Sequence, residues 1–383
     1  MLMNCVINEK YKLDTRVGGG SYGDVYIGHN VVTKAKVAIK IEDTRSDHED
    51  RLSHEYKVNK LLSDYVIVPK AKYFGAVDNR YNAMVMELMG PSLEDLFTMC
   101  KRKFNLKTVL MLGKQMLTRL ETMHKQGWVH RDIKPDNFAM GVEDGSDKNV
   151  HILDFGLAKR FKYEHKNVHV SYKDGRSSVI GTARYTSINS HIGIEQTRRD
   201  DLEALGYTLV YFFRGRLPWQ GIKQVTTQEK YHAIYRQKDA ISIEELCKGM
   251  PKKFIDYFHH VYNLDYSTKP DYKMLRQLFK DMLAEKGFLD DNDFEWLKKP
   301  EYLRILHARM KSPPPTVVLS IPQLQSKPSE PKKRKTKSQK KREALAAGKP
   351  IKVKPKYICK ADRERFGITT KTIPQNQLKL YCM

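Results

Sequence analysis

Short runs of β-type residues open the chain. KYKLDTRV, DVYIG and KVAIKI lie within residues 10–41 and are separated by a glycine cluster and by NVVTKA. This order predicts an antiparallel sheet. Further along, Leu52, Glu55, Asn59 and Leu62 recur at helical spacing on one stripe. The Glu55 carboxylate is therefore expected on a buried face, where it requires a cation.

The pattern changes from strands to helices after the run YNAMVMELMG, which ends at Gly90 and Pro91. Asn105 is the expected N-cap of a helix that runs until Gly127. The apolar residues of this helix are Leu106, Val109, Leu110, Gly113, Leu117 and Leu120. Two loops, WVHRDIKPDNFAM and NVHILDFG, come next, and helical patterns resume from residue 200 to about 308. We expect a β-rich unit over 1–90, a helical unit over 91–308 and a tail over 309–383.

The tail differs in composition from the rest of the chain. Past Lys311 it is rich in Lys and Pro and lacks apolar periodicity, which predicts a linker and a largely disordered segment. KKRK at 332–335 and KKR at 340–342 match a nuclear-import cluster. The same charge would bind an import receptor, nucleic acid or an acidic protein. A merely solvated tail is the alternative, and YICKADRERF at 357–366 is a candidate docking element.

The charge of the whole chain points to phosphate-bearing or acidic partners. Among 383 residues, 69 are Lys or Arg and 45 are Asp or Glu, which gives a net charge of +24. The cysteines show no paired spacing, which argues against a disulfide framework and a Cys-based zinc site. No run approaches the roughly 18 apolar residues of a spanning helix, and the first residues lack the order of a secretory signal. We expect a protein of the cytoplasm and nucleus with no membrane attachment.

A glycine-rich stretch, GGGSYGDV at 18–25, is the first candidate for binding phosphate. Gly18, Gly20 and Gly23 would let backbone amides approach phosphate oxygens without a side-chain clash. Taken alone, the stretch fits a flexible hairpin turn better than a phosphate-binding loop. VAIK follows on a predicted strand and would bring the Lys40 ammonium over those phosphates, with Glu55 as its partner.

HRDIKPDN, residues 130–137, is the strongest signal. It supplies Asp132 to accept a hydroxyl proton, Lys134 two places on, and Asn137 to bind a divalent cation. Asp154 in the following DFG adds a carboxylate for the same metal. Because the charge in phosphoryl transfer spreads over oxygen atoms, positioned cations and amides carry most of the catalysis.

With these motifs in order, residues 10–300 resemble the eukaryotic protein kinases. Three longer strings, SINSHIGIEQTRRDD, MVMELMGPSLEDLF and LPWQGIK, resemble the casein kinase 1 family in particular. The resemblance implies an α+β bilobal kinase fold. It has a small, mainly antiparallel amino-terminal lobe with one key helix and a larger, mainly helical carboxy-terminal lobe. It also implies a serine/threonine protein kinase, monomeric in its catalytic part, that uses ATP with Mg²⁺.

The resemblance assigns roles to individual residues. Asp132 would be the catalytic base, and Lys134 the γ-phosphate contact typical of Ser/Thr kinases, while Asn137 and Asp154 would hold the metal. Lys40 and Glu55 would form the ion pair of the small lobe. Met86 would be the gatekeeper, with Glu87 and Leu88 as the hinge. The remaining nucleotide-binding residues would be Val17, Gly18, Gly19, Gly20, Ser21, Tyr22, Gly23, Asp24, Val25 and Ala38.

The family also implies two anion sites that favour acidic or phosphorylated protein substrates. Arg184 and Lys230 would form one. Arg131 would form the other, together with Arg176 or Lys173.

Three features of the chain qualify the resemblance. Ala139 replaces the leucine that relatives place under the adenine ring, which would weaken ATP binding. Glu229 beside Lys230 would partly cancel the field of that lysine, and so mute the preference for phosphorylated substrates. The activation segment offers Ser177, Ser178 and Thr182, but we expect basal activity without their phosphorylation.

Three other functions fit the sequence less well than an active protein kinase. A nucleotide-binding scaffold without catalysis would lack one of the key residues, and all of them are present. A small-molecule phosphotransferase would lack the peptide shelf, and GTARYTSIN is intact. The interpretation of the chain as chiefly a nucleic-acid binder is supported only by the basic tail.

Overall fold

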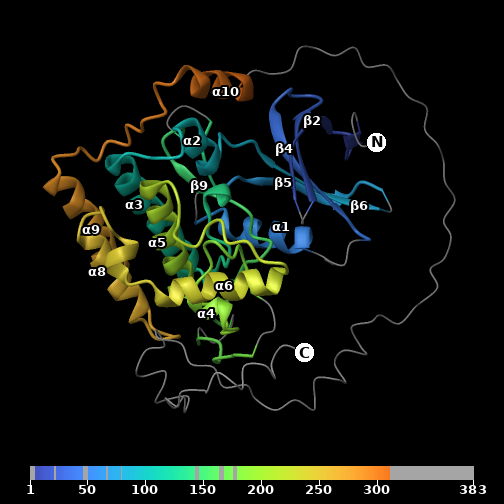
Figure 1. Ribbon diagram of the computed structural model, residues 1–383. Helices are drawn as coiled ribbons and strands as arrows, with labels where there is room; N and C mark the ends of the chain where they lie inside the picture. The colour runs from blue at the N-terminus through green and yellow to red at the C-terminus, as the bar shows by residue number, and fades with distance from the viewer. Residues whose placement is uncertain are drawn as a thin grey trace, which may run out of the picture.

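The computed structural model in Figure 1 describes residues 5–20, 23–45, 51–65, 68–78, 80–142, 146–163, 168–175 and 179–310. Several sequence predictions fall outside these residues. They concern Ser21 and Tyr22 in the glycine-rich stretch, Arg176, Ser177 and Ser178 in the activation segment, and the whole of the tail from residue 311, with its basic clusters.

The small lobe is built on a six-stranded antiparallel sheet in the order β1-β2-β3-β4-β6-β5. Its strands are β1 (Val6–Ile7), β2 (Tyr11–Gly20), β3 (Gly23–Asn30), β4 (Lys36–Asp43), β5 (Ala71–Ala76) and β6 (Tyr81–Glu87). Alternating apolar positions build its core, where Leu13, Ile39 and Val85 are fully buried. Gly23 requires its glycine, because it has φ +122° and a Cβ there would lie 2.2 Å from the Ile41 carbonyl oxygen.

One helix, α1 (Arg51–Leu62), accompanies this sheet. Leu52, Glu55, Val58, Asn59 and Leu62 form its buried stripe, as the spacing predicted. The buried Glu55 carboxylate therefore points toward the strand that carries Lys40.

The large lobe is mainly helical, so the expected two-lobed architecture is present (Figure 1). Its long helices are α3 (Leu106–Lys125), α5 (Arg198–Arg214), α6 (Thr227–Ala240), α8 (Lys253–Tyr262) and α9 (Tyr272–Glu285). The other helices of this lobe are α2 (Leu93–Met99), α4 (Ile188–His191), α7 (Ile243–Leu246) and α10 (Pro300–Met310). The predicted N-cap is confirmed, because Asn105 Oδ1 accepts a 2.8 Å hydrogen bond from the Thr108 amide.

Two short antiparallel pairs of strands position the catalytic motifs in the large lobe. Strand β8 (Phe138–Met140) pairs with β9 (Val150–Ile152), and this places the η1 turn (Pro135–Asn137) next to the residues that follow β9. Strands β7 (Trp128–Val129) and β10 (Lys159–Arg160) pair in the same way on either side of the two motifs. In the described part of the chain, none of the helices has the length and apolarity needed to cross a bilayer.

Candidate active site

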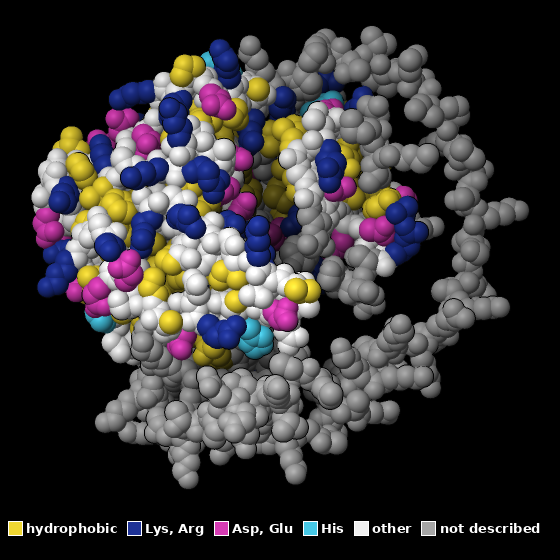
Figure 2. Space-filling model, in the orientation of Figure 1, with side chains coloured by type: hydrophobic (Ala, Val, Ile, Leu, Met, Phe, Trp, Pro, Cys, Tyr) yellow, Lys and Arg dark blue, Asp and Glu magenta, His cyan; other side chains and the backbone are white. Residues whose placement is uncertain are grey.

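A cleft of about 1180 Å³ lies between the lobes, and Figure 2 shows hydrophobic side chains in the hollow that separates them. Most of the residues expected at the nucleotide line this cleft: Val17, Gly18, Gly19, Val25, Ala38, Lys40, Glu55, Met86, Glu87 and Leu88. On the large-lobe side the lining includes Lys134, Asn137, Ala139 and Asp154. The structure thus brings the separate sequence motifs to one concave surface.

The described residues of the β2–β3 turn are paired across the hairpin, Gly20 with Gly23 and Gly19 with Asp24. Asp24 is not among the residues of the described chain that line the cleft. Its carboxylate forms an ion pair with the exposed Arg16, with 2.7 Å between Asp24 Oδ1 and Arg16 Nη2. The side chain of Asp24 therefore forms an exposed ion pair between β2 and β3.

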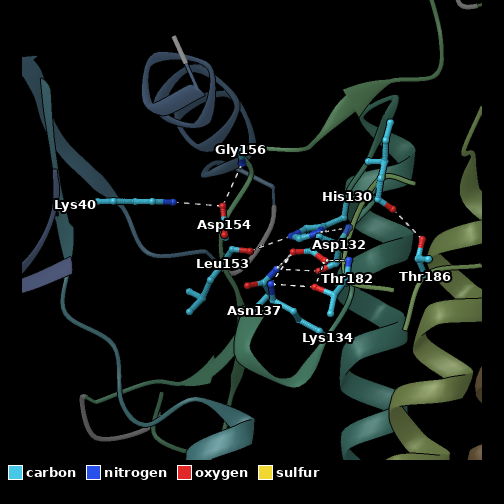
Figure 3. Close-up of polar contacts among 11 residues, drawn as sticks. Lys40, His130, Asp132, Lys134, Asn137, Leu153, Asp154, Gly156, Thr182 and Thr186 are labelled. Carbon is cyan, nitrogen blue, oxygen red and sulfur yellow. Dashed lines mark hydrogen bonds and ion pairs between the residues drawn. The ribbon is translucent and has the colours of Figure 1, made fainter. Parts of the chain in front are cut away.

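Lys40 joins the two lobes electrostatically. Its Nζ lies 2.5 Å from Glu55 Oε2 on α1 and 3.3 Å from Asp154 Oδ1 of the large lobe, and Figure 3 shows it reaching across the cleft toward Asp154. Burial alone would lower the pKa of Lys40, but the charges of Glu55 and Asp154 raise it above its ordinary value. Lys40 is therefore a fixed ammonium at the centre of the cleft.

The catalytic loop gathers polar side chains around Asp132 (Figure 3). Lys134 Nζ lies 2.7 Å from Asp132 Oδ2 and 3.3 Å from Thr182 Oγ1. Thr182 donates to Asp132 Oδ1 twice, from its amide and from its hydroxyl, both at 2.8 Å. Asn137 Nδ2 donates to the Asp132 carbonyl at 2.8 Å. A carboxylate fixed on both oxygens in this way has a defined orientation toward the cleft.

A buried aspartate of α5 holds this loop in place. Asp201 accepts 2.8 Å hydrogen bonds from the amides of His130 and Arg131, and a third from His124 Nε2. Burial raises the pKa of Asp201, but the hydrogen bonds from His124 and from the His130 amide keep it below its ordinary value. Because Arg131 has φ +69°, which is unfavourable for a residue with a side chain, these contacts also maintain a strained backbone.

Oxygen atoms suited to Mg²⁺ are available at the cleft. Asn137 donates through Nδ2, which leaves its carbonyl oxygen as the ligand atom, and in the described residues Asp154 Oδ2 accepts no hydrogen bond. No group of three or more His, Cys, Asp or Glu in the described ranges could hold a metal. Asn137 and Asp154 therefore fit a cation that takes its other ligands from phosphate oxygens and water.

The expected anion sites have different surroundings. Arg184 and Lys230 both line the continuation of the cleft, and among the described residues no carboxylate pairs with either cation. Glu229 instead accepts the Thr226 amide at 3.1 Å, in the capping box that begins α6. The Glu229 carboxylate is therefore hydrogen-bonded to the backbone at the start of α6.

Arg131, in contrast, has internal partners. Its Nε donates to the Leu157 carbonyl at 2.7 Å, and its Nη1 lies 3.6 Å from the buried Glu195. Lys159 also pairs with Glu195, at 2.8 Å. Arg131 therefore supports the backbone after DFG, and the Arg176 expected beside it lies outside the described residues.

Three residues with clear structural roles were not found by sequence reasoning. Thr182 was considered only as a phosphorylation site, and its two bonds to Asp132 were not foreseen. Neither Asp201 nor Lys238 carries a local signal for its role, because each acts on backbone groups far away in the sequence. Lys238 is 1% exposed and donates to the carbonyls of Ala183 and Thr186.

This arrangement can bind a nucleotide and place its phosphates between Lys40 and the catalytic loop. The chain also matches the family model for the protein kinase domain over residues 11–286, most of its length. The chain belongs to the protein kinase family. The expected α+β bilobal fold is thereby confirmed, and with it a phosphotransferase activity that acts on proteins. Kinases of this family use ATP and Mg²⁺.

The Lys40–Glu55 pair gives this kinase an expected pH dependence. Burial raises the pKa of Glu55 to about 7, although Lys40 opposes the shift. As the pH falls through 7, Glu55 takes up a proton and loses its attraction for Lys40, so kcat/KM for ATP should be high above this pH and decline below it. Rate measurements from pH 5.5 to 8.5 check this. In Glu55→Gln the decline should be absent and kcat/KM low throughout; a decline that persists in this variant belongs to another group.

Proposed function

We propose that this protein kinase is a casein kinase 1-like enzyme that transfers the γ-phosphate of ATP to Ser or Thr in acidic or pre-phosphorylated protein segments. The three long strings described in the sequence support the casein kinase 1 assignment. Support for the Ser/Thr choice comes from Lys134, whose Nζ lies between Asp132 and Thr182.

In this mechanism Asp132 orients the substrate hydroxyl and accepts its proton. The hydroxyl oxygen forms a bond to the γ-phosphorus as the bond from that phosphorus to the β-bridging oxygen breaks. Lys134 balances negative charge on the transferred group, and Lys40, held by Glu55, orients the phosphates that remain. When bound to Asn137 and Asp154, Mg²⁺ would neutralise charge on the phosphate oxygens.

The observation that carries the substrate preference is the position of Arg184 and Lys230. Both line the same cleft as Lys134, and in the described residues neither has a carboxylate partner. Trp219 Nε1 donates to the Arg184 carbonyl at 2.7 Å, and the guanidinium lies 5.7 Å from the centre of the Tyr185 ring. This supported cation, together with Lys230, favours a substrate that brings its own anion, because arginine binds phosphate and carboxylate directionally.

Replacing Arg184 by alanine tests this preference. The variant should lose about 10- to 100-fold in kcat/KM on a pre-phosphorylated peptide, the equivalent of one charge-assisted hydrogen bond. On the same peptide without the phosphate, the loss should stay below about three-fold. Initial rates on the two peptides measure the difference.

Arg236→Ala is the matched control, since Arg236 is an exposed arginine of α6. It should leave both rates unchanged. Equal losses on both peptides in Arg184→Ala would contradict the anion site and would assign Arg184 to loop structure.

The basic tail supports a second, separable proposal. We propose that the clusters at 332–335 and 340–342 direct part of the protein from the cytoplasm to the nucleus through an import receptor. The same segment would also bind nucleic acid in a salt-dependent way, while the catalytic part acts as a monomer. Deleting residues 311–383 from a fluorescently tagged protein tests this, and an unchanged distribution would reject it.

A further inference from the structure

The last described helix lies beside the hinge. In Figure 1, α10 is drawn in orange close to α2, the helix that follows the hinge. Tyr302 is 1% exposed and Leu306 6% exposed, and both belong to the apolar core of the large lobe. The helix is therefore anchored on the large lobe by its buried face.

Near its carboxyl end, α10 also contacts the small lobe and the hinge. Lys36 on β4 donates from Nζ to the Ala308 carbonyl at 2.8 Å, where a helix end attracts a cation. Arg309 donates from Nη1 to the carbonyl of Met89, just after the expected adenine-binding residues Glu87 and Leu88. One helix thus reaches both lobes and the segment that connects them.

The Met89 contact fixes one particular peptide group. Its carbonyl accepts from Arg309, while the amide on the other side of the same peptide bond, that of Gly90, donates to the Met140 carbonyl at 2.8 Å. Because a peptide group is planar, bonds to both of its polar atoms fix its orientation. The peptide group that joins Met89 to Gly90 is therefore held at its carbonyl by α10 and at its amide by β8.

Arg309 itself lines the nucleotide cleft, together with Leu88 and Ser92. Burial lowers the pKa of Arg309, although Asp95 partly offsets this. Among the described residues no carboxylate forms an ion pair with Arg309 or Lys36. Helix α10 thus contacts the hinge and β4 through hydrogen bonds from a cation to a backbone carbonyl. The geometry of these bonds depends on the relative position of the lobes.

We propose that α10 completes the nucleotide site of this kinase, with Arg309 as a positioning residue for ATP. By holding the Met89–Gly90 peptide, Arg309 keeps the hinge in its nucleotide-binding conformation before ATP arrives. Binding then requires less ordering of the backbone, which raises affinity without any new contact. The proposal rests on membership of the protein kinase family and is independent of the substrate preference proposed above.

The test compares two arginines of the same helix in the full chain. Arg309→Ala should weaken binding of ADP and of a non-hydrolysable ATP analogue by about 5- to 10-fold in calorimetry, as expected when pre-organisation is lost. KM for ATP should rise by the same factor, while kcat and the peptide KM stay within about two-fold. Arg304→Ala, at an exposed position five residues earlier in α10, should bind nucleotide like the wild type.

Two further variants keep the result interpretable. Lys36→Ala should give a smaller loss of the same kind, and Arg309→Lys should recover part of the affinity, because it keeps a donor near Met89. Thermal unfolding confirms that each variant is folded. Nucleotide binding by Arg309→Ala at the wild-type level, or the same loss in Arg304→Ala, would overturn the proposal. Because calorimetry needs no peptide substrate, its outcome does not depend on the casein kinase 1 assignment.

Discussion

Replacing Asp132 by asparagine is expected to lower kcat by about 10²- to 10⁴-fold, the usual contribution of a positioned general base. Asparagine has nearly the same shape and can still accept the bonds from Thr182, so the loop should keep its structure. What is lost is the ability to take the substrate proton, together with the negative charge that pairs with Lys134. Initial rates at saturating ATP and peptide measure the effect, and KM for ATP should change by less than about two-fold.

The control for this change is Asp256→Asn, at an exposed aspartate of α8 in the same lobe. It should leave kcat unchanged. If Asp132→Asn kept more than a tenth of the wild-type kcat, Asp132 would not be the base, and its two bonds from Thr182 would be purely structural.

Replacing Lys238 by methionine should have the largest effect on stability. Lys238 Nζ donates to the Ala183 and Thr186 carbonyls, at 3.0 Å and 2.5 Å, and lies 4.9 Å from the centre of the Tyr207 ring. Methionine fills the space but leaves two buried carbonyls without a donor, at a cost of about 1–3 kcal/mol each in the free energy of unfolding. Denaturant unfolding measures this loss.

Lys238→Met should also weaken the binding of the peptide substrate more than the binding of ATP. Because Ala183 and Thr186 flank Arg184, a loosened loop would raise the peptide KM more than KM for ATP. Arg236→Met, on the exposed face of the same helix, is the control and should change neither property. A stability loss below about 0.5 kcal/mol would show that water satisfies both carbonyls, and that the burial of Lys238 has another reason.

The sequence predicted those parts of the site whose signals are local. The β-type runs, the buried stripe that contains Glu55 and the cap at Asn105 are all features of short segments. Short-range chemistry could also have explained Glu229, since Thr226 three residues earlier makes the capping box. The sequence prediction considered Glu229 only as a neighbour of Lys230.

Contacts between distant segments could not be predicted in this way. Asp201 binds the amides of His130 and Arg131 across some 70 residues, and Arg309 reaches the Met89 carbonyl from the far end of the described chain. Periodicity shows which face of a helix is buried, but not which backbone group that face meets. Arg131 illustrates the limit. The family resemblance implied an anion site at Arg131, but no local pattern predicted its partners Glu195 and the Leu157 carbonyl.

The Asp201 contacts bear on how this enzyme would unfold. Asp201 lies in the first turn of α5, whose following residues are buried in the core of the large lobe. The amides that it binds cannot be released while that helix stays in place, so the catalytic loop and the core form one cooperative unit. A partly denatured molecule that retains this core should also retain a correctly folded catalytic loop, and the loss of either should report the loss of both.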